Sequence, residues 1–203
     1  MHIVCTDLEG VLVPEIWINV AAKTGIKELK LTTRDISDYD VLMKKRLAIL
    51  DKHGISLADI QAVIATMEPL DGALDYLNWL RERVQVMVVS DTFVEFARPL
   101  MAKLGWPTIL CHSLSVDEKG MVSNYNLRQK DSKRQVILAL KKLKYEIISI
   151  GDSYNDTTML SEAQHGILFC PPENVEAEFP QYPVTRSYRQ AMALIGQIIE
   201  AGA

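Results

Sequence analysis

The sequence HIVCTDLEG at residues 2–10 joins a short apolar segment to two carboxylates. Its first part, His2–Leu8, is largely apolar and contains β-branched side chains, which predicts a buried strand. Asp7 lies near the end of that strand and Glu9 follows two residues later, so both carboxylates face the same side of an extended chain. One of them can act as a nucleophile and the other as a general acid or base. A solvated turn is the competing interpretation, because Asp-x-Glu is a common pattern.

Apolar segments of this kind recur along the chain and alternate with amphipathic ones. The alternation predicts an α/β fold with a doubly wound, mostly parallel sheet. In such a sheet, ligands bind beyond the carboxyl ends of the strands. The further expected strands are Val84–Val89, Pro107–Cys111, Glu146–Ile150 and Gly166–Phe169, with a hairpin in Leu114–Leu127 that turns around Asp117–Gly120. The expected helices of this part are Ala73–Arg83, Phe93–Leu104, Ser132–Leu143, Thr157–Glu162 and Tyr188–Ile199.

Residues 14–70 depart from this alternation, because no strand pattern interrupts them. The stretch is charged and helical in its periodicity. We therefore expect a small all-helical cap at residues 14–70, inserted into an α/β core formed by residues 1–13 and 71–203. The helical patterns of the expected cap are Glu15–Lys23, Lys27–Leu31, Asp40–His53 and Leu57–Thr66.

Polar residues stand at the ends of three expected strands and should share one crevice, because the carboxyl ends of parallel strands meet at one edge of a sheet. A helix cap would explain a single Asp or Asn in residues 151–156, but not several such groups facing the carboxylates of Asp7 and Glu9. Asp7 and Asp152 facing each other repel unless a cation lies between them. Hard oxygen ligands with several waters are typical of Mg²⁺. The three motifs are Asp7-Leu8-Glu9-Gly10, Ser90-Asp91-Thr92 and Gly151-Asp152-Ser153-Tyr154-Asn155-Asp156.

Single residues near the same edge could bind a phosphate. The hydroxyl of Ser90 can donate to a phosphate oxygen, although an N-cap serine explains the residue equally well. Asp91 is unusual beside an anion, so we expect its backbone rather than its side chain to face the ligand. Lys133, near a helix start, could balance the charge of the phosphoryl group. Lys130 is the competing candidate, and a solvated basic patch is the alternative.

These motifs, in this order, resemble those of the haloacid dehalogenase superfamily of phosphotransferases. DLEGV at residues 7–11 resembles the first motif, Ser90 the second, Lys133 the third and GDSYND at residues 151–156 the fourth. One subgroup of that superfamily carries a helical cap between the first and second motifs. The resemblance therefore implies a Rossmann-like haloacid dehalogenase core with the expected cap.

Within that superfamily, residues 7–15 and 151–156 are similar to phosphoserine phosphatases, in particular to the phosphoserine:homoserine phosphotransferase type. This similarity implies a phosphoaspartyl intermediate on Asp7. It also implies Mg²⁺ held by Asp7, the backbone carbonyl of Glu9 and Asp152, with Asp156 supporting them from behind. The implied substrate-binding residues are Glu15, Arg46, Ser90, Asp91, Lys133 and Asn155.

Two of these residues lie in the expected cap, and their chemistry suits phosphoserine, which carries an ammonium and a carboxylate. Glu15 can pair with the ammonium group, and Arg46 can hold the carboxylate through two parallel hydrogen bonds. Without the resemblance, Glu15 would be a first-turn acid favoured by the helix dipole. Arg46 would be a solvated helix residue in the basic stretch MKKR at residues 43–46.

Glu9 departs from the superfamily pattern, in which Asp is usual at this position, and Val11 stands where Thr is common. One additional methylene moves the carboxylate by about 1.5 Å, which is enough to matter in catalysis. We expect Glu9 to protonate the leaving serine oxygen. It would then deprotonate water or an alcohol such as homoserine.

The resulting hypothesis is a Mg²⁺-dependent phosphoserine phosphatase that also transfers the phosphoryl group to homoserine. A haloacid dehalogenase-type phosphatase of another small phosphorylated metabolite is the first alternative. A non-catalytic protein that binds a phosphorylated ligand, or accepts a phosphoryl group on Asp7, is the second.

The overall composition excludes several classes of protein. The 203 residues are 48% apolar and 24% charged, which is typical of a globular chain. A net charge of −4 offers no broad electrostatic attraction to nucleic acid or to anionic membranes. With three separated cysteines, no signal-peptide pattern and no long apolar run, we expect a cytoplasmic protein that binds neither nucleic acid nor membrane.

Overall fold

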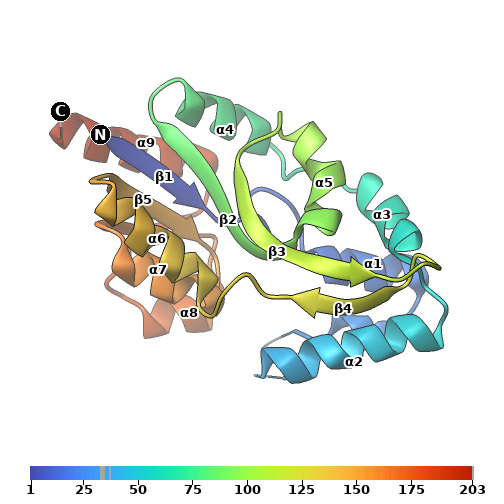
Figure 1. The fold of residues 1–203 in the computed structure, drawn as a ribbon. Coiled ribbons are helices and arrows are strands. Elements are labelled where there is room, and N and C mark those ends of the chain that lie inside the picture. Colours follow the sequence, from blue (N-terminus) through green and yellow to red (C-terminus); the bar gives the residue numbers. More distant parts are fainter. Residues whose placement is uncertain (33–34, 37, 203) are drawn as a thin grey trace.

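A single sheet runs through the centre of the computed structural model, which describes residues 1–32, 35–36 and 38–202. Among these residues, seven strands lie in the order β4-β3-β2-β1-β5-β6-β7 (Figure 1). Neighbouring strands are parallel except β3 and β4, which form an antiparallel hairpin. The predicted doubly wound, mostly parallel sheet is therefore confirmed. The strands are β1 (His2–Thr6), β2 (Gln85–Phe93), β3 (Ile109–Val116), β4 (Val122–Asn126), β5 (Glu146–Gly151), β6 (His165–Phe169) and β7 (Val184–Thr185).

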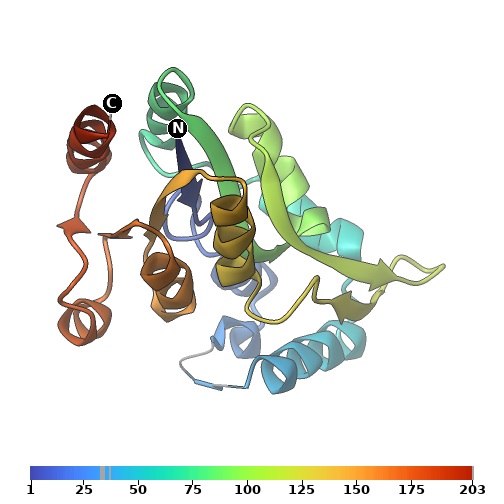
Figure 2. The same ribbon diagram turned by 60° about the vertical axis from the view of Figure 1, so that its left-hand side comes forward.

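Helices cover both faces of the sheet (Figure 2). Successive side chains of a strand point to opposite faces, so a strand covered on both sides is apolar throughout. In β1, Val4 packs with the helices of one face, while Ile3 and Cys5 pack with those of the other. The first face carries α4 (Ala73–Arg81), α5 (Val94–Lys103) and α9 (Tyr188–Ala201), and the second carries α6 (Ser132–Lys142), α7 (Thr157–Glu162) and α8 (Glu173–Glu178).

The described part of residues 14–70, called the helical segment below, contains helices and no strand. Three residues of the expected cap, at positions 33, 34 and 37, lie outside the described residues. Apolar side chains of the segment join the same core as α4 and α5. The division into a cap and a core stays a prediction. The elements of the segment are α1 (Ile16–Thr24), the 3₁₀ helix η1 (Lys27–Lys30), α2 (Tyr39–Lys52) and α3 (Leu57–Ala65).

The β3–β4 hairpin reaches across to the helical segment, as Figure 1 shows. At its tip, the Gly120 carbonyl accepts a hydrogen bond of 2.9 Å from the Leu57 backbone N–H. Farther along the hairpin, Tyr125 donates its hydroxyl to the carboxylate of Asp40. The rings of Tyr125 and Tyr39 meet edge to face with their centroids 6.0 Å apart. The hairpin therefore joins the sheet to α2 and α3.

Some predicted boundaries were wrong. The expected strand Pro107–Cys111 and the first arm of the expected hairpin are one strand, β3. Two polar residues, His112 and Ser113, interrupt the apolar pattern there, yet both pair within the sheet. Helix α8 and strand β7 were not predicted, because at six and two residues they are too short to show a periodic pattern. No helix in the described ranges is long and apolar enough to cross a bilayer.

Candidate active site

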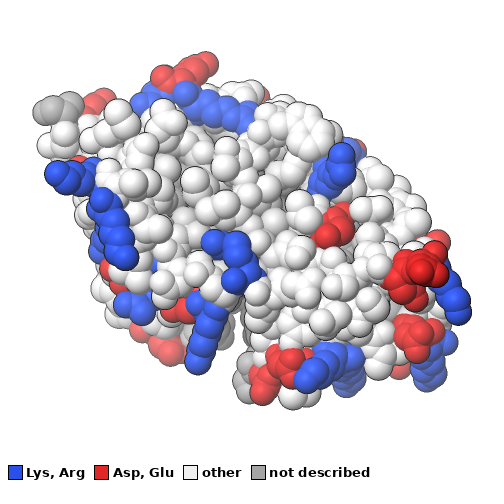
Figure 3. Space-filling model, in the orientation of Figure 1, with Lys and Arg blue, Asp and Glu red and all other residues white. Residues whose placement is uncertain are grey.

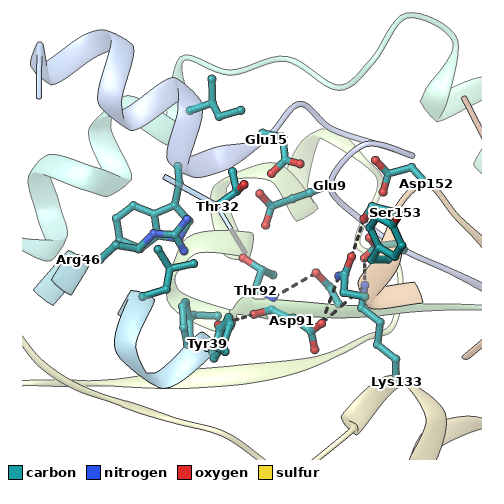
Figure 4. Close-up of a pocket in the computed structure, with 18 residues that line it drawn as sticks. Glu9, Glu15, Thr32, Tyr39, Arg46, Asp91, Thr92, Lys133, Asp152 and Ser153 are labelled. Carbon is teal, nitrogen blue, oxygen red and sulfur yellow. Dashed lines mark hydrogen bonds and ion pairs between the residues drawn. The ribbon is translucent and has the colours of Figure 1, made fainter. Parts of the chain in front are cut away.

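The carboxyl ends of three adjacent strands bring the polar motifs together (Figure 4). Asp7 follows the central strand β1, and Asp152 follows β5 on one side of it. The backbone N–H of Asp7 donates to the Ile150 carbonyl at 2.9 Å, which holds the Asp7 backbone beside β5. Asp7 is 3% exposed, so its carboxylate lies in a largely water-free environment. Asp7 and Asp152 both line one cavity of about 200 Å³.

Lys133 supplies the positive charge of this end of the cavity. Its ammonium lies 2.9 Å from Asp7 Oδ1 and 2.7 Å from Asp156 Oδ1, and its side chain is 2% exposed. Burial lowers the pKa of Lys133, but the carboxylates of Asp156 and Asp7 outweigh burial and hold that pKa well above its usual value. Lys133 therefore stays charged, whereas Lys130 is exposed. The structure favours Lys133 over Lys130 as the cation beside Asp7.

Asp156 is fully buried, and both of its carboxylate oxygens have partners within the protein. Oδ1 accepts from Lys133, while Oδ2 accepts the backbone N–H groups of Asp152 and Ser153 at 3.0 and 3.1 Å. A Cβ on Gly151 would come within 2.3 Å of Asp156 Cγ, so only glycine allows this close approach. Asp156 thus holds both Lys133 and the loop that carries Asp152.

Mutual repulsion shapes the acidic cluster of Asp7, Asp152 and Asp156, whose oxygens lie within 4.8 Å of one another. Burial, followed by the charge of Asp156, raises the pKa of Asp7 well above its usual value. The same two causes raise the pKa of Asp152 to about 7. Gly10, at a φ of 77°, permits this crowding, because a Cβ there would lie 2.4 Å from Asp152 Oδ2.

This acidic cluster fits a hard divalent cation. Carboxylate oxygens are the ligands such cations prefer, and a bound cation would remove the repulsion between the acids. Because both oxygens of Asp156 are engaged, Asp7 and Asp152 are the carboxylates that remain to bind it. An ion such as Mg²⁺ therefore matches the chemistry of the donors at this position.

Glu9 lies half-buried between the acidic cluster and the helical segment. Its Oε2 accepts the Ile16 backbone N–H at 2.7 Å, which ties the loop after β1 to the start of α1. Burial, followed by the nearby charge of Glu15, raises the pKa of Glu9 to about 7. Both protonation states are therefore populated near neutral pH, as acid and base catalysis requires.

Glu15 and Arg46 come from the helical segment and line the same cavity; the side of the cavity that they line is called the helical end below. Glu15 lies beside Glu9, and Arg46 lies on the side away from Asp152 (Figure 4). Glu15 precedes α1 as its N-cap residue and makes no capping hydrogen bond, so the expected helix start at Glu15 was one residue early. Arg46 is 7% exposed, and its guanidinium lies over the Trp17 ring at 4.5 Å. The alternative of a solvated Arg46 is therefore wrong.

Ser90 is buried and lines the cavity, but it does not cap a helix. Strand β2 continues past it to Phe93, which is itself the N-cap residue of α5. The pairing of β2 with β3 is irregular between Val89 and Phe93, so this end of the strand bulges. The Ser90 hydroxyl accepts the Thr92 backbone N–H at 3.2 Å. The N-cap interpretation of Ser90 is wrong.

Asp91 turns its side chain toward the site, contrary to expectation. Its carboxylate lies 3.9 Å from Lys133 Nζ and accepts hydrogen bonds from Ser132 Oγ at 3.2 Å and Asn155 Nδ2 at 3.3 Å. Burial raises the pKa of Asp91, but Lys133 and His112 hold it well below its usual value. Asp91 is therefore a charged acceptor that orients Asn155 at the edge of the cavity.

Several residues of the site carry no signal in the sequence pattern. His112 is 5% exposed and lies 3.5 Å from Asp91 Oδ1, and its Nδ1 accepts the Arg128 backbone N–H at 3.1 Å. Tyr39 of α2 donates its hydroxyl to the Asp91 carbonyl at 3.4 Å. Trp17 supports Arg46. These contacts join residues far apart in the chain, so no local motif could have indicated them.

A second, larger cavity of about 980 Å³ adjoins the first and shares Asp91, Lys133 and Asn155 with it. Its wall includes Tyr39 of α2 and Lys130, which precedes α6 by two residues. Figure 3 shows the surface hollowed between α2 and the side of the molecule formed by α6 and α8. Acidic and basic side chains are interspersed on that face, without a large patch of one sign.

Known proteins are similar to this chain in sequence and in fold. The model of the haloacid dehalogenase-like hydrolases matches residues 1–164. The phosphoserine phosphatase ThrH of Pseudomonas aeruginosa is 64% identical over 188 residues, covering 93% of this chain and 92% of that protein. A phosphoserine phosphatase of Pseudomonas syringae pv. tomato is 63% identical over 188 residues, covering 93% of this chain and 79% of that protein.

Solved structures of lower sequence identity share the fold. A phosphoaspartyl intermediate analogue of a phosphoserine phosphatase aligns with a TM-score of 0.78 at 18% identity, covering 95% of this chain and 98% of that one. A substrate-bound phosphoserine phosphatase complex aligns with a TM-score of 0.76 at 18% identity, covering 95% and 97% of the two chains. The arrangement of sheet and helices is thus the same in all three.

Proposed function

This chain belongs to the haloacid dehalogenase-like hydrolases, and from that membership we propose that it is a phosphoserine phosphatase working through a phosphoaspartyl intermediate on Asp7. The observation that carries the proposal is one cavity with two chemically different ends. At the core end, Asp7, Lys133, Asp152 and Asp156 form a buried charged cluster. At the helical end, Glu15 and Arg46 offer one negative and one positive charge. The names of the two Pseudomonas relatives support the same substrate.

The first step is attack by an Asp7 carboxylate oxygen on the phosphorus of phosphoserine. The bond from phosphorus to the serine oxygen breaks as the bond to Asp7 forms. Glu9, whose pKa of about 7 leaves a protonated fraction at neutral pH, gives its proton to the departing serine oxygen. Lys133, already in contact with Asp7, balances the negative charge of the phosphoryl oxygens.

The second step releases the phosphoryl group from Asp7. Glu9, now a carboxylate, takes a proton from water while the water oxygen attacks phosphorus and the bond to Asp7 breaks. The products are inorganic phosphate and the free Asp7 carboxylate. With homoserine in place of water, the same proton transfer would give phosphohomoserine, so the site suits phosphotransfer as well as hydrolysis.

Asp7, Asp152 and the backbone carbonyl of Glu9 would hold the divalent cation, with Mg²⁺ as the proposed ion. When bound, it would supply positive charge to the phosphoryl oxygens. Asp156 acts from behind by holding Lys133 and the backbone of Asp152.

Substrate selection falls to the helical end of the cavity. Glu15 pairs with the ammonium group of phosphoserine, and Arg46 holds its carboxylate. Ser90 and Lys133 bind the phosphoryl group. Asn155 contacts the substrate from the position in which Asp91 holds it. Residues 14–70 thus serve as a cap that selects the amino acid.

The test is an incubation with L-phosphoserine and Mg²⁺, with and without homoserine, in which free phosphate and phosphohomoserine are both measured. We expect phosphate release in the absence of homoserine and phosphohomoserine in its presence. Asp7→Asn is the control and should yield neither product. Faster turnover of a sugar phosphate or nucleotide than of phosphoserine would reject the proposed substrate. Absence of turnover with any phosphomonoester would instead favour a binding protein.

A further inference from the structure

Arg46 is a buried cation without a carboxylate partner among the described residues. Its guanidinium Nη2 donates to the Leu31 carbonyl at 2.8 Å, and Nη1 lies 3.6 Å from the sulfur of Met43. Its Nε is buried and has no hydrogen-bond partner in the part of the chain that the structure describes. Burial lowers the pKa of Arg46 to about 10, so the group is still charged at neutral pH. The charges of Glu9 and Glu15 act on Arg46 from a distance, but neither carboxylate is in contact with it in the described part of the chain. A buried charge of this kind is costly without a contacting partner, and the cavity that Arg46 lines is open to one.

One face of the guanidinium is occupied by an aromatic ring. The Arg46 Cζ lies 4.5 Å from the centroid of the Trp17 ring, within the range of a cation–π contact. A contact of this kind holds the guanidinium over the ring and leaves for a carboxylate those N–H groups that Leu31 and Met43 do not occupy. Trp17 is itself only 9% exposed and also lines the cavity.

Trp17 is anchored to the sheet through a series of aromatic rings. Its ring meets that of Phe96 of α5 edge to face, with centroids 5.3 Å apart and an interplanar angle of 71°. Phe96 in turn meets Phe93, at the end of β2, with centroids 5.6 Å apart. Phe93 lies three residues after Ser90 in the same strand. These ring contacts therefore connect the Trp17 indole to the end of the sheet where the phosphoryl group would bind.

From this geometry we propose that Trp17 is a specificity-determining positioning residue, whose indole face holds the Arg46 guanidinium in the orientation that receives the carboxylate of an amino-acid phosphate. The inference rests on the proposed function, because it requires a substrate with a carboxylate at the helical end of the cavity. It goes further in assigning part of the substrate selection to an aromatic residue that carries no charge itself. Trp17 acts through Arg46 and not on the phosphoryl group.

The test compares two substrates that differ only in the carboxylate. Phosphoethanolamine keeps the phosphoryl and ammonium groups of phosphoserine and lacks its carboxylate. For Trp17→Leu, we expect kcat/KM with phosphoserine to fall about tenfold, mainly through a higher KM, while kcat/KM with phosphoethanolamine changes less than about threefold. Trp17→Phe keeps an aromatic face and should recover most of the loss.

The chain provides a matched control in Trp79, over whose ring the Arg83 guanidinium lies at 4.6 Å, away from the cavity. Trp79→Leu removes a cation–π contact at nearly the same distance and should leave the kinetics with both substrates unchanged. Titration calorimetry in an Asp7→Asn background measures binding without turnover. There, Trp17→Leu should weaken the binding of phosphoserine but not of phosphoethanolamine.

Two results would overturn the inference: an equal loss with both substrates in Trp17→Leu, which would mean a general structural role, or an unchanged KM for phosphoserine. Failure of the proposed function looks different. In that case the unsubstituted protein would not prefer phosphoserine to phosphoethanolamine, and Arg46→Gln would affect both substrates alike. Thermal melting of each variant identifies loss of folding. If Trp17→Leu does not fold, Trp17→Phe is compared with the unsubstituted protein on both substrates instead.

Discussion

The two buried cations of the cavity, Lys133 and Arg46, differ in how the protein treats them. Lys133 touches two carboxylates at 2.7 and 2.9 Å, so its charge is balanced before any ligand arrives. Arg46 has an aromatic ring, a backbone carbonyl and a thioether around it, and it forms no ion pair within the described ranges. The core end is therefore organised by its own contacts, while the helical end is left to be completed by the substrate. Chemistry and selection are separated along one cavity.

Removing Lys133 should have the largest effect of the substitutions that test this difference. Lys133→Met leaves Asp7 and Asp156 buried without their cation, which should cost about 3–5 kcal/mol of unfolding free energy. Turnover should fall by at least about a thousandfold, because the phosphoryl oxygens lose the charge that stabilises them. Urea unfolding and initial rates measure the two effects. Lys130→Met removes an exposed neighbour as the control, and a similar loss in that variant would contradict the assignment.

Replacing Glu9, the acid–base group between the two ends, should have the second largest effect. Glu9→Gln should slow turnover about a hundredfold, because the amide cannot donate a proton to the serine oxygen. In the unsubstituted protein, phosphorylation of Asp7 needs protonated Glu9, so its rate should fall as the pH rises through about 7. Single-turnover quench experiments across pH measure this step. Full turnover by the Gln variant would exclude the role.

Removing the unpaired cation should behave in the opposite way from removing the paired one. Arg46→Met replaces a buried charge that lacks a partner, so the free energy of unfolding should stay the same or rise. The KM for phosphoserine should increase about tenfold to a hundredfold, because a charge-assisted pair with the carboxylate is lost. Charge reversal at Glu15 should likewise affect phosphoserine more than phosphates without an ammonium group. A strongly destabilised Arg46→Met variant would contradict the comparison.

Cation binding should give the smallest effect and should depend on pH. The pKa of Asp152 is raised to about 7 in the folded protein, above its unfolded value. The folded state therefore holds the Asp152 proton more tightly than the unfolded state does. The contribution of this group to the free energy of unfolding falls as the pH rises from its pKa in the unfolded chain through its pKa in the folded one. Mg²⁺ should therefore raise the melting temperature by about 2–4 °C at pH 8 and by less at pH 5.5. Asp152→Asn is the control and should lose most of the shift. An equal shift at both pH values would place the cation elsewhere.

The difference between the two ends also explains how much the sequence could predict. The strands and the acids at their ends follow from local apolar periodicity and from the rule that parallel strands end at a common edge. Arg46 lies in a basic stretch that is typical of a solvated helix, and only the resemblance pointed to it. Trp17 and His112 act through residues distant in sequence, so their roles depend on tertiary packing that no local pattern contains.

The local sequence pattern also gave a wrong prediction at two positions of the sheet. Ser90 resembled an N-cap because a helical pattern follows it, but β2 bulges and continues to Phe93 before the helix begins. The polar pair His112 and Ser113 suggested a break in what is one strand, since sheet pairing satisfies their backbones. In both cases hydrogen bonding to a neighbouring strand overrode the local preference.

The covalent intermediate is the most direct test of the account. The protein is mixed with L-phosphoserine and Mg²⁺, quenched in acid within a single turnover, digested and analysed by peptide mass spectrometry. We predict one added phosphoryl group on the peptide that contains Asp7, formed at the rate of serine release and missing from Asp7→Asn. Serine released at full rate with no phosphoryl group on that peptide would contradict the account.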